Sequence, residues 1–381
     1  MKVSVVDYAL SCASGGSTEE AMNSIFGGKS GIAEESGRFI GRVSASLGSL
    51  PGQFLEFDTR QARLAVHVVK MIAPSIFRAR EKWGPKRVAV LLGTSTGGIE
   101  WVEANYTPGT RDVVSSLDGG ACNKQAFGAA SYVVQNMFEL EGPAYAISTA
   151  CSSSSHVFGA AKRLIHSDRV DAVVVLGVDT LCHVTIEGFL GLGLLASSLC
   201  RPFDVARDGI NIGEAGAAFL LERDLDAEFH LCGFGASSDG YHSTRPPPDG
   251  AGAALCMQAA LEDAGLLPQN VVGVHTHGTG TVENDRAEGR AITGVFGAGM
   301  SVVSTKGATG HTLGACGALN AAIALESLRR QCLPGTHGLE VIDPVLSVNA
   351  DSAPRPVTGD YVASNSFAFG GNNVTLILGR S

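Results

Sequence analysis

The stretch AISTACSSSSHVFGAAKRL, residues 146–164, passes from an apolar, strand-like segment into one cysteine, four serines and a helix-like run of small and apolar residues. A second stretch, VVSTKGATGHTLGACGALN at residues 302–320, repeats this order: an apolar strand ending in Ser-Thr, a polar turn and a small-residue helix. Internal similarity of this kind indicates a duplicated unit. We therefore predict two related halves whose functional turns emerge at one face of the fold.

Short runs rich in valine and isoleucine alternate with helix-spaced segments along the chain. The runs RVAVLLG, VDAVVVLGV and VVGVH are bounded by glycine, proline or polar residues, as buried strands are. Segments such as residues 59–72 and 315–330 have helical spacing between them, which predicts a layered α/β fold. The charged stretch ERDLDAEF at residues 222–229 predicts the boundary between an N-terminal half, 1–224, and a C-terminal half, 225–381.

The composition excludes several classes of protein. With 381 residues the chain can bury a sizeable core without disulfides. A formal net charge of −9 argues against a nucleic-acid binder, which normally carries a basic face. The nine cysteines form no C-x-x-C pair, so we expect neither a disulfide framework nor a zinc site. The longest apolar run, residues 188–200, is too short to span a bilayer, and we expect a soluble, cytoplasmic protein.

Cys151 stands where the first quoted strand ends and its helix begins. A thiol at a helix N-terminus faces unpaired N–H groups and the positive end of the helix dipole, which lower its pKa and favour the nucleophilic thiolate. A buried, inert packing cysteine would fit the same position. The stretch alone leaves both interpretations open.

A second chemistry-bearing stretch is HTHGTGTVENDRAE, residues 275–288, which follows an expected strand. His277 opens a Gly-Thr-Gly-Thr turn whose hydroxyls can hold an imidazole or a ligand. His275 and His277 share one strand face, as a metal-binding pair would, but no third ligand has a recognisable spacing. We therefore predict that the pair binds no metal.

Two glycine-rich turns lie further along the chain. The stretch STKGATGHTLGACG, residues 304–317, places Lys306 and His311 before a small-residue helix, without the G-x-x-x-x-G-K-[ST] order of a nucleotide-binding loop. In the stretch SNSFAFGGNN, Gly370 and Gly371 would let a backbone amide approach a substrate oxygen, the alternative being a glycine bulge inside a hairpin.

One cysteine, two histidines in glycine-rich turns, a lysine and a glycine-flanked amide together describe acyl-thioester chemistry. In this order and spacing the motifs resemble the β-ketoacyl-acyl carrier protein synthases, condensing enzymes with a thiolase-like fold. The resemblance runs from about residue 88 to the end and includes PFDVARDGINIGEAGAAFLLE and SSDGYHSTRPPPDGAGAAL; it is weaker over residues 1–87. Five separate motifs agree.

This resemblance implies a duplicated five-layer α/β/α/β/α fold and a dimer, either a homodimer or a heterodimer with a related subunit. It implies condensation of an acyl thioester with malonyl-acyl carrier protein, with loss of carbon dioxide, in fatty acid or polyketide biosynthesis. The acyl carrier protein is the expected partner, and no cofactor or metal is expected. We expect no nucleic-acid or membrane partner.

The resemblance also assigns roles to residues of the first three stretches. Cys151 would accept the acyl chain, and His277 and His311 would hydrogen-bond the malonyl thioester carbonyl and favour decarboxylation. Neutral imidazoles that donate through N–H can stabilise the charge that develops on the thioester oxygen. A covalent acyl-cysteine divides the condensation into two steps.

Further roles follow for the remaining motif residues. The amide of Phe369, with that of the cysteine, would form the oxyanion hole, and its ring would be the gate between the acyl pocket and the malonyl site. Lys306 would tune the electrostatics of the site, and Asp285 would brace its loops. Gly370 and Gly371 would support the gate.

The sequence departs from the family pattern at several positions. Ala368 replaces a common glycine, His275 stands where an asparagine is common, and the glutamate expected fourteen residues after Lys306 is replaced by Asn320. The loop between LLASSL and CRPFD is short. These departures predict a specialised pathway enzyme with altered acyl selectivity, in which the lysine lacks its usual anionic partner.

Two other functions fit the same motifs. A chain-length partner subunit of a heterodimer would keep the fold without full catalysis, and a non-elongating acyltransferase or thioester hydrolase would use the cysteine alone. Retention of both histidines favours the condensing enzyme over either alternative. For its acidic carrier substrate we expect steering by basic residues near the entrance, among them Arg60, Arg63 and Lys70.

Overall fold

The computed structural model describes residues 3–105, 120–223 and 226–381. The boundary predicted between residues 224 and 225 lies outside these described residues. Among them, no helix combines the length and the hydropathy needed to cross a membrane. All nine cysteines are free thiols.

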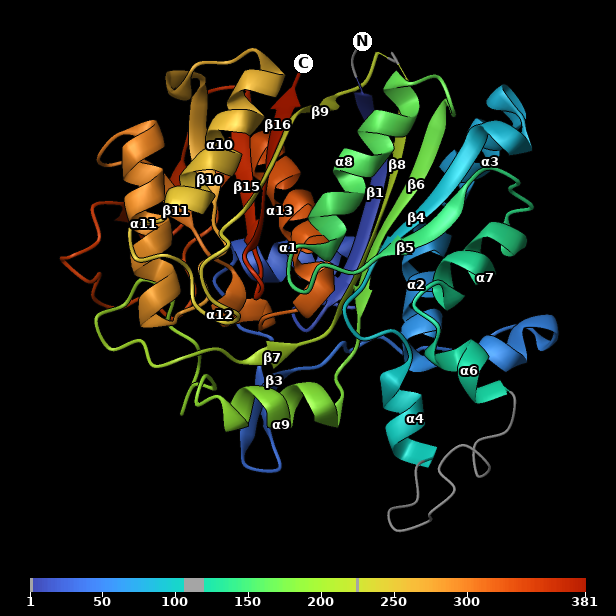
Figure 1. Ribbon diagram of the computed structural model, residues 1–381, viewed down its shortest axis with the longest axis horizontal. Coiled ribbons are helices and arrows are strands. Elements are labelled where there is room, and N and C mark those ends of the chain that lie inside the picture. The colour runs from blue at the N-terminus through green and yellow to red at the C-terminus, as the bar shows by residue number, and fades with distance from the viewer. Residues whose placement is uncertain (1–2, 106–119, 224–225) are drawn as a thin grey trace.

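Eleven strands of the described residues form one hydrogen-bonded sheet (Figure 1). Their order across the sheet is β13 (Asn349–Ala350), β11 (Ser301–Val303), β10 (Val271–His275), β15 (Tyr361–Phe367), β16 (Asn372–Arg380), β9 (Phe229–Ser238), β1 (Val3–Cys12), β8 (Ala215–Arg223), β6 (Ala172–Asp179), β4 (Val88–Gly93) and β5 (Ala144–Ile147). The strand β1 joins the two halves: it pairs with β8 from Val3 to Cys12, but with β9 only from Val3 to Val5. Beyond this short seam the strands of each half form a sheet of their own.

Helices cover both faces of the two half-sheets (Figure 1). The outer face of the N-terminal sheet carries α2 (Arg60–Met71), α3 (Ala73–Trp83) and α7 (Ala129–Met137). The outer face of the C-terminal sheet carries α10 (Ala251–Ala264) and, against it, α11 (Val282–Phe296). Between the sheets lie α8 (Ser153–His166) and α13 (Cys316–Arg330), which contact strands of both halves, together with α1 (Thr18–Phe26). The predicted α/β/α/β/α layering is confirmed.

The strand β6 illustrates why the sequences of the central strands are uninterrupted apolar runs. Val173 and Val175 belong to the core between the sheets, whereas Val174 and Leu176 belong to the core under the outer helices. Because both faces of the strand are covered, alternation between apolar and polar residues disappears. This is the pattern that predicted buried strands.

The two stretches that suggested a duplication meet at the centre of the molecule. The first forms β5 and α8, and the second forms β11, the short helix α12 (Lys306–Thr309) and α13. Small residues let the two central helices approach closely: a Cβ atom on Gly317 would lie 2.0 Å from the hydroxyl of Ser155, and the amide of Ala318 donates to the hydroxyl of Ser154 at 2.9 Å. The small-residue helix is therefore a requirement of this contact.

Candidate active site

Cys151 lies in a tight turn between β5 and α8. The preceding residue, Ala150, has φ of 49°, a left-handed conformation that residues with a Cβ rarely adopt. The hydroxyls of Ser152 and Ser153 donate to the carbonyls of Thr149 and Ala150 at 2.9 and 2.6 Å. The serines that follow the cysteine thus hold the turn that presents the thiol, and Ser152 at the N-cap makes no side-chain capping bond.

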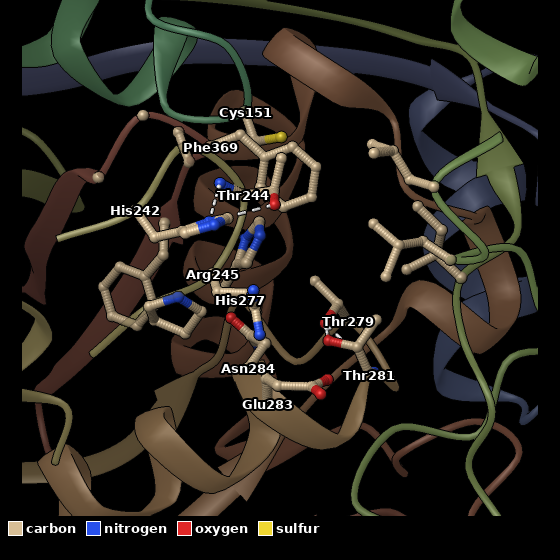
Figure 2. A pocket seen from close by; sticks show the side chains of 18 of the residues that line it. Cys151, His242, Thr244, Arg245, His277, Thr279, Thr281, Glu283, Asn284 and Phe369 are labelled. Atoms are coloured by element: carbon tan, nitrogen blue, oxygen red, sulfur yellow. Dashed lines mark hydrogen bonds between the residues drawn. The ribbon is translucent and has the colours of Figure 1, made fainter. Parts of the chain in front are cut away.

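Two cavities meet at the thiol. The larger, of about 450 Å³, contains His277 and His311 and extends to the exposed residues His242 and Arg245 (Figure 2). The smaller, of about 260 Å³, is largely apolar, with lining residues that include Val184, Phe189, Leu192 and Leu313. Both cavities are lined by Cys151, Phe189, Leu192 and Phe369. The thiol is therefore buried but reachable from two sides.

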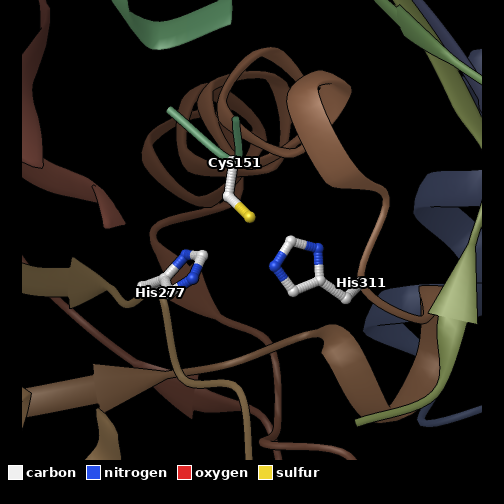
Figure 3. Close-up of side chains that lie close together, drawn as sticks. All are labelled: Cys151, His277 and His311. Carbon is white, nitrogen blue, oxygen red and sulfur yellow. The ribbon is translucent and has the colours of Figure 1, made fainter. Parts of the chain in front are cut away.

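Cys151, His277 and His311 converge from three separate turns (Figure 3). The sulfur and one ring nitrogen of each histidine lie within 4.8 Å of one another, and all three residues are buried. The two imidazole rings have centroids 5.3 Å apart and are nearly perpendicular. The structure thus brings together the cysteine and the two histidines that the sequence singled out. His275 is not part of this group, because its Nε2 lies 3.0 Å from the hydroxyl of Ser327.

The three converging residues also offer a donor set that could hold a metal ion. A thiolate and two imidazoles are ligands that zinc accepts. The ammonium of Lys306 is close enough to lower the pKa of both histidines, and its charge opposes a second cation there.

The prediction of a low pKa for Cys151 is wrong. Burial raises the pKa of this thiol well above its ordinary value, and the neighbouring thiol of Cys316 adds to the increase. The charge of Lys306 and the backbone amide of Phe369, which is directed at the sulfur, lower it by less. The sequence argument counted the helix terminus but not the loss of water around the sulfur, which disfavours the anion.

Both active-site histidines are neutral at ordinary pH. Burial lowers the pKa of His277 far below its usual value and that of His311 to about 3, with Lys306 contributing in each case. The Nδ1 atom of His311 accepts the backbone amide of Leu313 at 3.0 Å, so the ring proton of His311 lies on Nε2. The predicted neutral N–H donor is therefore present at this position.

Lys306 is buried, and its ammonium donates to the carbonyl oxygen of His277. The side-chain amide of Asn320 donates to the carbonyl of Thr276, the preceding residue, at 3.2 Å. Among the described residues, no carboxylate forms an ion pair with Lys306. Its positive charge therefore acts on the thiol and imidazoles without a direct anionic partner.

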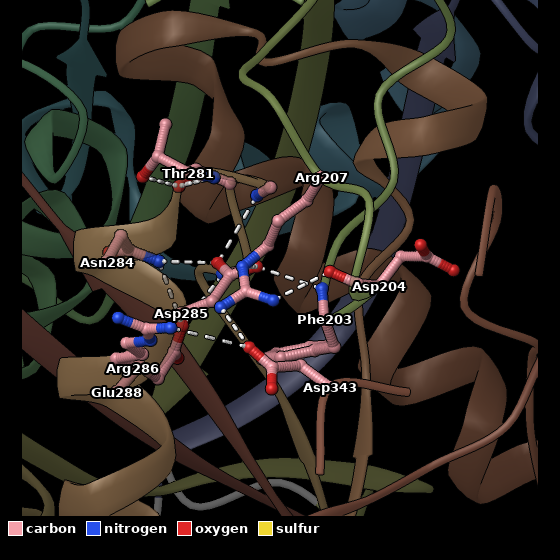
Figure 4. A network of polar contacts seen from close by, with 12 residues as sticks. Phe203, Asp204, Arg207, Thr281, Asn284, Asp285, Arg286, Glu288 and Asp343 are labelled. Carbon is pink, nitrogen blue, oxygen red and sulfur yellow. Dashed lines mark hydrogen bonds and ion pairs between the residues drawn. The ribbon is translucent and has the colours of Figure 1, made fainter. Parts of the chain in front are cut away.

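Asp285 lies in a network of polar contacts on α11 and the adjoining loops (Figure 4). Its carboxylate accepts the backbone amides of Phe203 at 2.9 Å and Gly280 at 3.2 Å, and lies 3.6 Å from the guanidinium of Arg207. The same arginine forms an ion pair with Asp343 at 2.9 Å. These contacts tie the loop after His277 to two other loops.

Two buried carboxylates that support the site were not predicted. Glu288, one turn after Asp285 on α11, accepts the amides of His277 and Gly278 at 2.8 and 2.7 Å. Its place three residues beyond a predicted acidic residue, on the same helix face, is a signal that could have identified it.

The second is Asp179, fully buried at the end of β6. It accepts hydrogen bonds from Thr94, Ser95 and Thr96 and from the amide of Gly314, which follows Leu313. It thereby links the wall of the smaller cavity to the segment that orients His311. An aspartate at the end of an otherwise apolar strand was the available signal.

The turn that carries Phe369 depends on the two glycines after it. Gly370 and Gly371 have φ of 84° and 77°, which residues with a Cβ seldom adopt. Their own amides are used within the protein, donating to the carbonyls of Ser243 at 2.8 Å and Ala368 at 2.9 Å. The amide that faces the thiol is that of Phe369, whose ring lies 5.6 Å from the ring of Phe189.

The basic residues predicted near the entrance do not line the two cavities. Arg60 forms an ion pair with the buried carboxylate of Glu214, and Arg63 pairs with Asp58 at 2.6 Å. Both arginines are therefore engaged in ion pairs within the fold. Lys70 is exposed on α2.

The sequence matches known proteins along most of its length. The sequence model of the β-ketoacyl synthase N-terminal domain matches residues 40–227, and that of the C-terminal domain matches residues 229–340. The chain is 36% identical over 318 residues to 3-oxoacyl-[acyl-carrier-protein] synthase 2 of Coxiella burnetii, covering 77% of this chain and 75% of the relative.

Solved structures agree with this match. A chain of the complex of the ketosynthase ApeO with its chain length factor ApeC, from Xenorhabdus doucetiae, is 35% identical, with a TM-score of 0.92 over 100% of this chain and 98% of that one. A β-ketoacyl synthase from Burkholderia phymatum is 28% identical, also with a TM-score of 0.92, over 100% and 99% of the two chains. Since both family domains match in order and the curated relative is matched over three quarters of its length, the protein belongs to the β-ketoacyl synthase family.

Proposed function

We propose that this protein is a β-ketoacyl-acyl carrier protein synthase that condenses an acyl group, held on Cys151, with malonyl-acyl carrier protein. The observation that carries the proposal is the convergence of this thiol with His277 and His311 within 4.8 Å. The curated relatives named 3-oxoacyl-[acyl-carrier-protein] synthase support the same reaction.

In the first step the sulfur of Cys151 attacks the acyl thioester, the carrier thiol leaves, and the cysteine proton moves to that thiol. Because the Nε2 of His311 carries the ring proton, it cannot accept another. His277, whose Nδ1 has no partner among the described residues, is the imidazole that can relay the proton. The amides of Cys151 and Phe369 hold the oxygen of the tetrahedral intermediate.

In the second step the malonyl thioester occupies the larger cavity. N–H donors on His277 and His311 bind its thioester oxygen, the bond to the carboxylate breaks, and carbon dioxide leaves an enolate. The enolate carbon attacks the acyl carbonyl, a carbon–carbon bond forms, and the sulfur of Cys151 departs as thiolate. The lowered pKa values of the two histidines mean that each ring is neutral and has one N–H group to donate to the thioester oxygen.

The two cavities divide the substrates. The smaller, largely apolar cavity suits the acyl chain, and the larger cavity suits the malonyl group and the carrier's prosthetic arm. Phe369 lines both, and its side chain is the gate between them. Lys306 raises the electrostatic potential at the thiol, and Asp285, with Gly370 and Gly371, holds the surrounding loops.

The proposal also includes that the protein forms a dimer and is located in the cytoplasm. The strand β5 is an edge of the sheet, with Tyr145 partly exposed, and offers unpaired backbone groups to a second copy of this chain or to a related subunit. The nine cysteines, all within the described residues, form no disulfide, which fits a reducing compartment. Light scattering on the purified chain should give about twice 39.2 kDa; a monomeric mass, with a dimer only after a related subunit is added, would favour the heterodimer.

The test of the reaction is mass spectrometry after incubation with acyl- and malonyl-acyl carrier protein. The intact chain should carry an acyl group on Cys151 and release a β-ketoacyl carrier protein two carbons longer, whereas Cys151→Ala should do neither. An acyl adduct followed only by free acid would favour a hydrolase. Failure to form any adduct, with malonyl carrier protein unchanged, would favour a non-catalytic partner subunit.

A further inference from the structure

We propose that Cys316 is a resolving thiol for Cys151, so that oxidation of the site by a hydroperoxide ends in a reversible disulfide between these two residues. This modification is separate from condensation and needs neither acyl substrate nor carrier protein. It makes the active site sensitive to oxidants while protecting its sulfur from irreversible damage.

The placement of Cys316 carries the inference. It is the first residue of α13, and its Sγ donates to the carbonyl oxygen of Cys151 at 3.0 Å. The two residues are buried in one small cluster, with Ala368 and Ala150 as their apolar neighbours. The thiols are close enough for Cys316 to be the second cause of the raised pKa of Cys151.

Access to the two sulfurs differs. Cys151 lines both cavities that meet at the site, whereas Cys316 lines neither of them. A small oxidant that enters the larger cavity therefore meets the sulfur of Cys151 first. Cys316 lies outside both cavities, in contact with the backbone of Cys151.

Other buried cysteines are held elsewhere. The sulfur of Cys200 donates to the carbonyl of Thr279 at 3.2 Å, and that of Cys256 donates to the carbonyl of Ala253 at 3.1 Å. Neither belongs to the cluster around Cys151. Cys256 therefore serves as a matched buried control.

The chemistry balances in two steps. A hydroperoxide transfers one oxygen to the sulfur of Cys151, giving a sulfenic acid, and is itself reduced to water or the corresponding alcohol. The sulfur of Cys316 then attacks this sulfur; the S–S bond forms, the S–O bond breaks, and the hydroxyl group leaves as water with the proton of Cys316. To form the bond, the side chain of Cys151 must turn about its Cα–Cβ bond toward Cys316, within a cluster whose other members, Ala150 and Ala368, have small side chains.

The experiment treats the full chain with hydrogen peroxide and reads intact mass and linked peptides. Wild type and Cys256→Ala should lose about 2 Da, yield a peptide pair joined through Cys151 and Cys316, and return to the starting mass with dithiothreitol. Because burial raises the pKa of Cys151, the reaction should accelerate as the pH rises from 7 to 9. Neither readout depends on condensing activity, so failure of the proposed function would leave this test intact.

Cys316→Ser keeps a hydrogen-bond donor to the backbone of Cys151 but cannot form the disulfide. In this variant peroxide should add about 32 Da at Cys151, as sulfinic acid, and dithiothreitol should not reverse it. Cys316→Ala, checked for folding by circular dichroism, should show the same irreversible mass increase as Cys316→Ser. The inference is overturned if wild type gives no Cys151–Cys316 linked peptide, or if the serine variant recovers its mass as fully as wild type.

Discussion

The backbone amide of Leu313 donates to Nδ1 of His311 at 3.0 Å and so fixes on which nitrogen the imidazole carries its proton. The Nε2–H group is left to face the thiol and the larger cavity. The amide of a residue only two positions further along the chain therefore determines that His311 is a hydrogen-bond donor in the second step of the reaction. His277 has no such constraint at its Nδ1 among the described residues.

Replacing His311 with alanine should impair decarboxylation far more than acylation. Loss of one preorganised donor to a developing oxyanion costs about 10²- to 10³-fold in rate, so release of carbon dioxide from malonyl carrier protein should fall by that factor. Acylation of Cys151, followed by mass, should remain within about tenfold of wild type. His183→Ala, at an exposed histidine on α9 (His183–Gly191), is the control. Unchanged decarboxylation in His311→Ala would refute the assignment.

Alkylation of Cys151 should be slow at neutral pH and should rise throughout the alkaline range. Because burial holds the pKa of this thiol above its ordinary value, its thiolate fraction grows about tenfold for each unit of pH up to pH 9. The rate of iodoacetamide addition, measured by mass between pH 6 and 9, gives this profile, with Cys151→Ala as background. A plateau below pH 8 would mean that the thiol is already ionised.

Acid should destabilise the fold through its buried neutral histidines. Burial lowers the pKa of His275 to about 3, as it does for His311, against about 6.5 in an unfolded chain. Between these values the unfolded state binds more protons, so the free energy of unfolding falls as pH falls from 6.5 towards 3, by about 2 kcal/mol for each histidine at pH 5. Stability is fully retained above pH 6.5.

Urea unfolding at pH 7 and pH 5 measures this effect. His275→Gln, which keeps a polar group near Ser327, should reduce the difference in stability between the two pH values by about 2 kcal/mol relative to wild type. His183→Ala should leave the difference unchanged. An equal pH dependence in His275→Gln and wild type would show that His275 does not contribute.

An anion at position 320 should weaken the field that Lys306 exerts on the thiol. The side chains of Asn320 and Lys306 donate to the adjacent carbonyls of Thr276 and His277, so a glutamate at 320 places negative charge near the ammonium. The pKa of Cys151 should rise further, and Asn320→Glu should be alkylated about threefold to tenfold more slowly at pH 8. Asn320→Gln is the neutral control, and equal rates in the two variants would contradict the argument.

The central layer and the three converging motifs could be predicted because the local sequence pattern agrees with the packing between segments that are distant along the chain. A strand, a turn and a small-residue helix occur twice, and close packing of α8 against α13 demands those small residues. The resemblance to condensing enzymes then identified Cys151, His277 and His311 before their proximity was known.

Other properties depend on neighbours that are distant along the chain. The raised pKa of Cys151 results from burial and from the neighbouring thiol of Cys316, which lies far along the chain, and a local argument about the helix terminus could include neither. Arg60 was expected near the entrance, and no local pattern reveals its buried partner, Glu214, about 150 residues away. The partners of Asp179, which the sequence analysis overlooked, are also distant along the chain: they come from the turn after β4 and from the segment before α13.

The position of β1 has a consequence for synthesis on the ribosome. This strand is translated well before its main partner, β8, which ends at Arg223, and before its second partner, which begins at Phe229. On the ribosome β1 therefore lacks both of these partner strands until residues 215–231 have been translated. A chaperone that binds apolar segments of the nascent chain should therefore stay bound longest at residues 3–12. Slower translation before residue 215 should increase aggregation of the nascent chain.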